Sequence, residues 1–122
     1  MTGDDINRLL NGSRTLVGVA ALAAPGKAFQ GAGLDARRNP QLPFVMRMFG
    51  ARDLVLGAGA LGTTAGERRR WLQAALAADV IDAIAAVAGH RGGYLPTHGA
   101  VMLATTAAIG SALGIAALAT SD

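Results

Sequence analysis

The hydrophobic positions of the chain fall into four long segments separated by short polar stretches. Residues 92–121 contain no Asp, Glu, Lys or Arg. The part from Leu95 to Thr120 is therefore longer than the roughly 20 apolar residues that a helix needs to cross a bilayer. Three earlier segments have a similar length and few charges, and no alternation of period two persists anywhere. The pattern predicts four helices, over residues 6–24, 43–64, 71–89 and 95–120.

The connections between these segments predict an antiparallel arrangement. Pro25 and Gly26 end the first helix, because neither residue continues a helix readily. Residues 26–42 form the one long loop, 66–70 a short charged turn that leads into Trp71, and 90–94 a glycine-rich turn. Trp71 is then placed as an interfacial anchor. We expect one all-α domain over residues 1–122, a four-transmembrane-helix antiparallel bundle with both termini on one face.

The composition favours a membrane over water as the surroundings of this bundle. The chain is 52% hydrophobic and only 16% charged, whereas soluble domains carry about 25% charged residues. A helix of a soluble bundle shows a charged stripe opposite its apolar one. Residues 54–61 and 100–119 show no such stripe. The absence of cysteine excludes a disulfide scaffold.

The basic residues do not predict a nucleic-acid binder and barely define an orientation. The net charge is +3, but the aromatic residues are scattered and no basic face is evident. Four basic residues fall on each face of the bundle, so the positive-inside rule is balanced. Those on the face with the termini are Arg8 and residues 68–70, and those on the other are Lys27, Arg37, Arg38 and Arg91. The densest group, residues 68–70, lies on the face with the termini and favours cytoplasmic termini.

Several charged residues lie inside the apolar segments, and these are the candidate site. An ionisable side chain at the bilayer centre costs at least about 2.5 kcal/mol, so such residues face inward and find partners. Asp79 and Asp82 are three apart and share one face of the third predicted helix. The set is balanced in charge and consists of Arg14, Arg47, Arg52, Asp53, Asp79 and Asp82.

The depth of each charge within its segment predicts which residues meet. Arg14 and Arg52 lie at similar depths, near that of Asp79. We expect Arg52 to reach Asp79 or Asp82. Asp53, which points about 100° away from Arg52, is expected to bond to Arg14 or to a neighbouring helix. Arg47 lies near the start of its helix, where its side chain can extend to the interface.

The charge set permits two interpretations. It is either a salt-bridge network that fixes the register of four Ala/Gly-rich helices, or a polar pocket with a function. In the second case Asp79 and Asp82 are the candidate acid–base residues. Arg52, and with it Arg14, would orient a polar head group. Nearby arginines weaken the acid–base case because they favour ionised carboxylates.

Three further motifs give weaker signals for helix packing, nucleotide binding and metal binding. Gly110 and Gly114 form a G-x-x-x-G pair, which lets helix backbones approach closely but also arises by chance in a chain rich in small residues. The G-x-G-x-x-G match over residues 57–62 lies inside an apolar helix with no preceding strand, so it predicts no dinucleotide site. His90 and His98 lack a third ligand nearby, and the sequence predicts neither a metal nor a cofactor.

One stretch resembles a known family. Residues 47–57, RMFGARDLVLG, fit R-x-x-G-x-R-D-x-x-L-G, and an aspartate-bearing third helix follows with Asp79 and Asp82. This pattern resembles small four-helix membrane proteins of unknown function from actinobacteria, which are distantly DoxX-like. The resemblance implies a four-helix bundle in a bacterial inner membrane and groups Arg47, Arg52 and Asp53 with the two aspartates. It supplies no catalytic residues.

These observations lead to two functional hypotheses. The first is a small integral membrane protein that self-associates or serves as an accessory subunit of a larger membrane complex. The alternative is a membrane-embedded isomerase or cyclase that acts on a lipophilic ligand, isoprenoid- or quinone-like, with aspartate acid–base chemistry. A proton or solute pathway ranks last, because four helices enclose no aqueous channel unless several protomers assemble.

Overall fold

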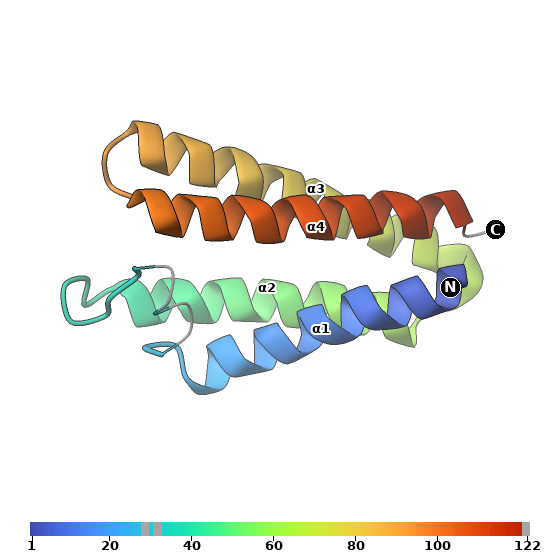
Figure 1. The fold of residues 1–122 in the computed structure, drawn as a ribbon. Helices are drawn as coiled ribbons and strands as arrows, with labels where there is room; N and C mark the ends of the chain where they lie inside the picture. The colour runs from blue at the N-terminus through green and yellow to red at the C-terminus, as the bar shows by residue number, and fades with distance from the viewer. Residues whose placement is uncertain (28–29, 31–32, 121–122) are drawn as a thin grey trace.

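The chain folds into two antiparallel helical hairpins. The computed structural model describes residues 1–27, 30 and 33–120. Its helices are α1 (Gly3–Ala23), α2 (Leu42–Gly62), α3 (Ala65–Arg91) and α4 (Thr97–Thr120), and the described residues contain no strand. Both ends of the chain lie at one end of the bundle, with the α1–α2 loop and the α3–α4 turn at the other (Figure 1). The prediction of an all-α, four-helix antiparallel fold is confirmed.

The largest difference from the sequence prediction is at the start of α3. This helix begins at Ala65 rather than at Trp71, so the charged stretch 66–70 is helical and not a turn. Arg and Glu are good helix formers. Glu67 lies in the first turn, where a negative charge is favourable next to the positive end of the helix dipole.

The first and last helices begin at well-defined caps. The backbone N–H of Asp5 donates to the Thr2 hydroxyl at 3.2 Å, and the carboxylate of Asp5 accepts from the Thr2 backbone N–H at 2.9 Å. This reciprocal capping box satisfies donors that the first turn would leave free. At α4, Pro96 precedes the helix and its carbonyl accepts from the Ala100 N–H at 2.9 Å.

Glycines bring the backbones of α1 and α2 into direct contact. A Cβ atom at Gly18 would lie 2.6 Å from the backbone nitrogen of Leu54 and 2.7 Å from the carbonyl oxygen of Gly50. A Cβ atom at Gly57 would lie 2.7 Å from the carbonyl oxygen of Asn11. No side chain larger than hydrogen fits at these crossings, so α1 and α2 pack as closely as glycine permits.

The second hairpin also depends on small residues. A Cβ atom at Gly110 would lie 2.7 Å from Oδ2 of Asp79, and one at Gly114 would lie 3.6 Å from Cδ1 of Leu76. The G-x-x-x-G pair of α4 thus faces α3 of the same chain. Trp71 packs on Gly59 of α2, where an added Cβ would lie 2.6 Å from the indole ring.

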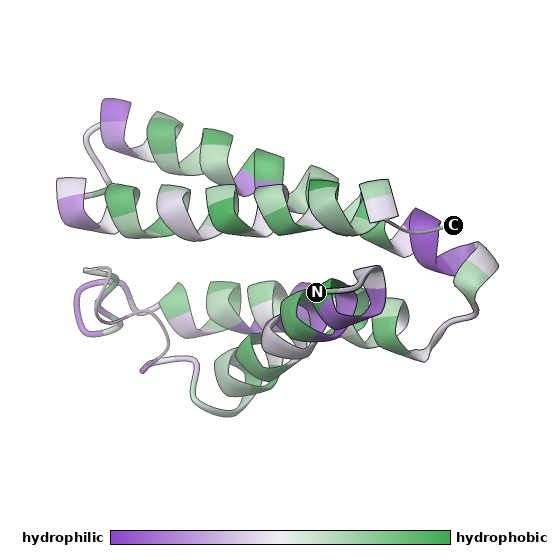
Figure 2. Cartoon of the chain, turned by 45° about the vertical axis from the view of Figure 1, so that its right-hand side comes forward, coloured by the Kyte–Doolittle hydropathy of each residue, from purple (hydrophilic) through white to green (hydrophobic). Residues whose placement is uncertain are grey.

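Polar side chains lie inside this bundle and apolar ones outside. The buried polar residues include Asn11 (0% exposed), Arg14 (7%) and Asp79 (8%). Large apolar side chains are exposed on every helix, and hydrophobic residues extend along α3 and α4 while the start of α3 is hydrophilic (Figure 2). Among the exposed ones are Leu16, Val55, Ile84 and Ile115.

Two helices, α3 and α4, are long and apolar enough to cross a membrane. Their apolar stretches are only 28% and 17% buried in the bundle, whereas the core helix of a soluble protein is mostly buried. Exposed apolar stretches of this kind are ones that a membrane or another protein can cover.

Candidate functional site

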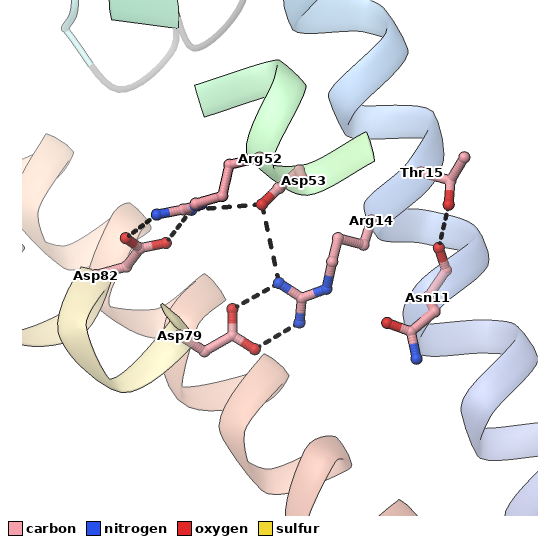
Figure 3. Close-up of polar contacts among 7 residues, drawn as sticks. All are labelled: Asn11, Arg14, Thr15, Arg52, Asp53, Asp79 and Asp82. Atoms are coloured by element: carbon pink, nitrogen blue, oxygen red, sulfur yellow. Dashed lines mark hydrogen bonds and ion pairs between the residues drawn. The ribbon is translucent and has the colours of Figure 1, made fainter. Parts of the chain in front are cut away.

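Two arginines each bind one aspartate of α3 through two hydrogen bonds. Arg14 of α1 donates from Nη1 to Oδ1 of Asp79 at 3.0 Å and from Nη2 to Oδ2 at 2.6 Å. Arg52 of α2 donates from Nη1 to Oδ1 of Asp82 at 2.9 Å and from Nη2 to Oδ2 at 2.7 Å. Such two-bond pairs are the strongest geometry that a guanidinium and a carboxylate form. Each pair joins one hairpin to the other (Figure 3).

Asp53 connects the two pairs more loosely. Its Oδ1 lies 3.4 Å from Nη2 of Arg52 and 3.9 Å from Nη1 of Arg14. The five side chains therefore form one series, which we call the charge network: Asp79, Arg14, Asp53, Arg52 and Asp82 (Figure 3). Its inner end is buried, whereas the side chains of Arg52 and Asp82 are 35% and 33% exposed.

The structure brings together most of the residues that the sequence singled out. Arg52 reaches Asp82, as expected, and Asp53 lies beside Arg14. Asp79, however, is bound by Arg14 rather than by Arg52. The sequence did not anticipate this division, because adjacent depths alone do not decide which of two arginines faces which aspartate.

Arg47 lies outside the charge network. Its side chain is exposed near the start of α2, and it forms no ion pair with another described residue. This position fits the expectation that the side chain extends toward the interface. Arg47 is therefore separated from Arg52, Asp53 and the two aspartates of α3, with which the family resemblance groups it.

The polar face of α1 extends beyond Arg14. Asn11 donates from Nδ2 to Oδ1 of Asn7 at 2.8 Å. The Thr15 hydroxyl donates to the Asn11 carbonyl at 2.7 Å, as Figure 3 shows. Asn11 is fully buried, and its Oδ1 has no hydrogen-bond partner among the described residues. The sequence analysis did not single out Asn7 or Asn11 as site residues. Their spacing of four and three residues from each other and from Arg14 was the signal that they share the inward face.

A cavity of about 580 Å³ separates the two hairpins and ends at the charge network. All four helices contribute to it, and its charged lining residues are Arg14, Asp53, Asp79 and Asp82. Ser13 and Thr106 also line it. Several of its lining residues are exposed, and five of these lie on α1 and α4, so the cavity reaches the surface between these two helices: Leu9, Ser13, Val17, Thr106 and Ile109. The remaining wall is mainly apolar and includes Leu10, Met46, Ala86, Leu103, Ala107 and Leu113.

The residues that the sequence considered for metal binding lie apart from this cavity. Nδ1 of His90 lies 3.2 Å from the carbonyl oxygen of Leu95, in the α3–α4 turn. His98 lies beside Gly33 of the α1–α2 loop. Within residues 1–27, 30 and 33–120, no three His, Cys, Asp or Glu side chains are grouped so that they could hold a metal ion.

The chain matches no protein-family model, no curated protein and no solved structure. The resemblance to small actinobacterial membrane proteins therefore stays a prediction from residues 47–57 and the two aspartates of α3. The functional argument rests on the geometry of the cavity and the charge network.

Proposed function

We propose that the protein is a small multi-pass membrane protein that binds a lipophilic molecule in the cavity between its hairpins. The observation that carries this proposal is the composition of the cavity wall. Apolar side chains from four helices surround a space of about 580 Å³, and the charge network, buried at its Arg14–Asp79 end, closes one side of it. Ligand sites typically combine an apolar wall of this size with a few polar groups that orient the ligand.

The lengths of α1 and α2 and the pairing of their charges support four membrane spans. Each helix has 21 residues, or roughly 31 Å at ~1.5 Å per residue, so each is long enough to cross most of a ~30 Å hydrocarbon layer while the first turn of α1, with Asp4 and Asp5, lies at its edge. Their central charges, Arg14, Arg52 and Asp53, face other helices. Lipid would thus meet mainly apolar side chains. The proposed membrane is a bacterial inner membrane, with both termini cytoplasmic.

The network geometry favours binding over acid–base catalysis. A general acid or base needs a carboxylate oxygen within reach of the substrate. Both oxygens of Asp79 accept hydrogen bonds from Arg14, and both oxygens of Asp82 accept from Arg52. The hypothesis of an isomerase or cyclase that uses these two aspartates therefore has less support than a binding role.

An accessory subunit is the second candidate. Gly110 and Gly114 give it no support, because both contact α3 of the same chain. The outer face of α3 does support it, since a row of β-branched residues is exposed there and can contact lipid or another membrane protein. The row consists of Val80, Ile81, Ile84 and Val87.

Native mass spectrometry of the detergent-purified protein, with extraction of bound molecules, tests the proposal. We expect a stoichiometric lipophilic molecule on the wild-type chain. Ala107→Phe should lose it, because the buried Ala107 lines the cavity. Ala108→Phe is the matched control, because the adjacent Ala108 is exposed and does not line the cavity. A wild-type chain without a bound small molecule but with a co-purifying protein would favour the accessory subunit instead.

A further inference from the structure

The charge network is not neutral. It contains two arginines and three aspartates, so its formal charge is −1 when every member is ionised. Two of the aspartates are matched by two-bond pairs to Arg14 and Arg52. Asp53 is the carboxylate left over after this pairing.

The distances identify Asp53 as the least compensated member. Its nearest guanidinium nitrogens lie at 3.4 and 3.9 Å, whereas the paired aspartates are reached at 2.6–3.0 Å. Asp53 is only 6% exposed, so bulk water does little to stabilise its charge. A buried charge without a full partner is unfavourable.

The surroundings of the cavity supply no further positive charge. Arg14 is the single basic residue among the described residues that line it, and Asp79 already uses two of its N–H groups. Asp53 itself lines the cavity. A positive group that entered the cavity would restore neutrality at Asp53, while the apolar walls would contact the rest of the molecule.

We propose that the molecule bound in the cavity is an amphiphilic cation whose positive group pairs with Asp53 and whose apolar body contacts the walls. This inference rests on the proposed function, since it assigns the charge of the lipophilic ligand. The cavity volume of about 580 Å³ lies within the range of pockets for small organic molecules. The opening between α1 and α4 gives such a molecule a route from the bilayer.

Two probes of equal shape and opposite charge test the inference. Tetraphenylphosphonium is a lipophilic cation, and tetraphenylborate is an anion of almost the same size. Equilibrium dialysis of radiolabelled tetraphenylphosphonium against the detergent-solubilised protein, with protein-free micelles as the blank, measures its binding. We expect saturable binding of this cation, and no saturable binding of radiolabelled tetraphenylborate in a separate dialysis, since the two ions would precipitate together if they were mixed. This comparison uses the wild-type chain and does not depend on the folding of any variant.

Asp53→Asn then tests the residue. The amide keeps the size of the side chain and an oxygen that accepts from Arg52, but it removes the negative charge. We expect tetraphenylphosphonium binding to weaken at least about tenfold, the loss that one charged contact typically causes. Asp4→Asn is the matched control, because it removes the same charge from an exposed ion pair with Arg68 outside the cavity. It should leave binding unchanged.

The outcomes separate this inference from the proposed function. Binding that is equal for both probes, or unaffected by Asp53→Asn, yet lost in Ala107→Phe overturns the cationic ligand and retains a lipophile site. No binding of tetraphenylphosphonium to the wild-type chain also overturns the inference. The proposed function is then judged separately, by the molecule that the purified protein retains.

Discussion

Arg14 of α1 and Asp79 of α3 are 65 residues apart in the sequence and form a two-bond ion pair near the middle of the bundle. A Cβ at Gly110 would lie 2.7 Å from Asp79 Oδ2, so α4 can approach this pair only because it carries glycine there. The ion pair joins the two hairpins, and the glycine lets α4 pack closely on α3 beside it. The charge network therefore holds the two hairpins together and also forms one wall of the cavity.

Removal of one member of this pair should be strongly destabilising. Asp79→Ala leaves Arg14 buried with only the distant Asp53 as a counter-charge. We expect the free energy of unfolding to fall by about 3–5 kcal/mol, as for other buried pairs that lose one partner. Denaturant titration in mixed micelles measures this change. Arg14→Met combined with Asp79→Leu should recover most of the loss, and a double variant no more stable than Asp79→Ala would contradict the argument.

The close contact between α1 and α2 predicts opposite effects at two glycines. Gly57→Val places side-chain atoms where Asn11 and Thr15 already lie, so we expect a loss of about 1–3 kcal/mol or more in unfolding free energy. Gly12→Ala meets no atom within 4 Å and should stabilise α1 by roughly 0.5–1 kcal/mol through helix propensity. The same titration compares the two variants. Equal effects would show that glycine content, rather than contact, determines hairpin stability.

The sequence predicted the helices well because their apolar segments are long and uninterrupted. It placed α4 within two residues at its start, since Pro96 marks the boundary. The predicted start of α3, residue 71, was wrong because a run of charged residues resembles a turn. Glu and Arg also favour helices. The stretch from Ala65 to Arg70 is a polar extension of α3 that precedes its apolar part.

The sequence predicted which charged residues form the candidate site, but not which arginine binds which aspartate. Charges inside an apolar segment must face inward, which is why Arg14, Arg52 and Asp79 were identified from the sequence alone. Which arginine reaches which aspartate depends on helix rotation and crossing, and these follow from glycine contacts such as Gly18 with Gly50. Helix periodicity within one segment does not contain this information. The cavity could not be predicted for the same reason.

The capping box at the start of α1 predicts a local acid transition. The backbone N–H and the hydroxyl of Thr2 both donate to the Asp5 carboxylate, and they hold the pKa of Asp5 below its ordinary value of 3.8. A lowered folded-state pKa means that the cap stabilises the helix start above pH 3.8 and is lost as the pH falls through the lower folded-state value. Asp5 precedes the apolar segment and is accessible to solvent.

NMR detects this transition through the Thr2 amide proton, which donates to Asp5. We expect its chemical shift to move with acidification below pH 3.8, together with lower protection from hydrogen exchange, relative to the intrinsic rate at each pH, in the first turn of α1. Asp5→Asn should abolish the pH-dependent shift, because the amide does not titrate. A Thr2 shift that follows acidification equally in Asp5→Asn would show that another group causes it.

Single cysteines distinguish four membrane spans from two, and the natural chain provides a clean background because it contains no cysteine. Asn39→Cys lies in the α1–α2 loop, Gly66→Cys at the start of α3 and Tyr94→Cys in the α3–α4 turn. All three positions are exposed, and none of the substitutions changes the formal charge. A membrane-impermeant maleimide applied to intact cells labels only the cysteines that face outward.

The informative position is residue 39. If all four helices span, positions 39 and 94 lie on one side and position 66 on the other, as the shared end of the two connections in Figure 1 requires. If α3 and α4 alone span, position 39 lies on the same side as position 66. With cytoplasmic termini we expect labelling at 39 and 94 and none at 66 until the cells are opened. Labelling at 94 alone would leave α1 and α2 on the cytoplasmic side, and the cavity would then open to water rather than to lipid.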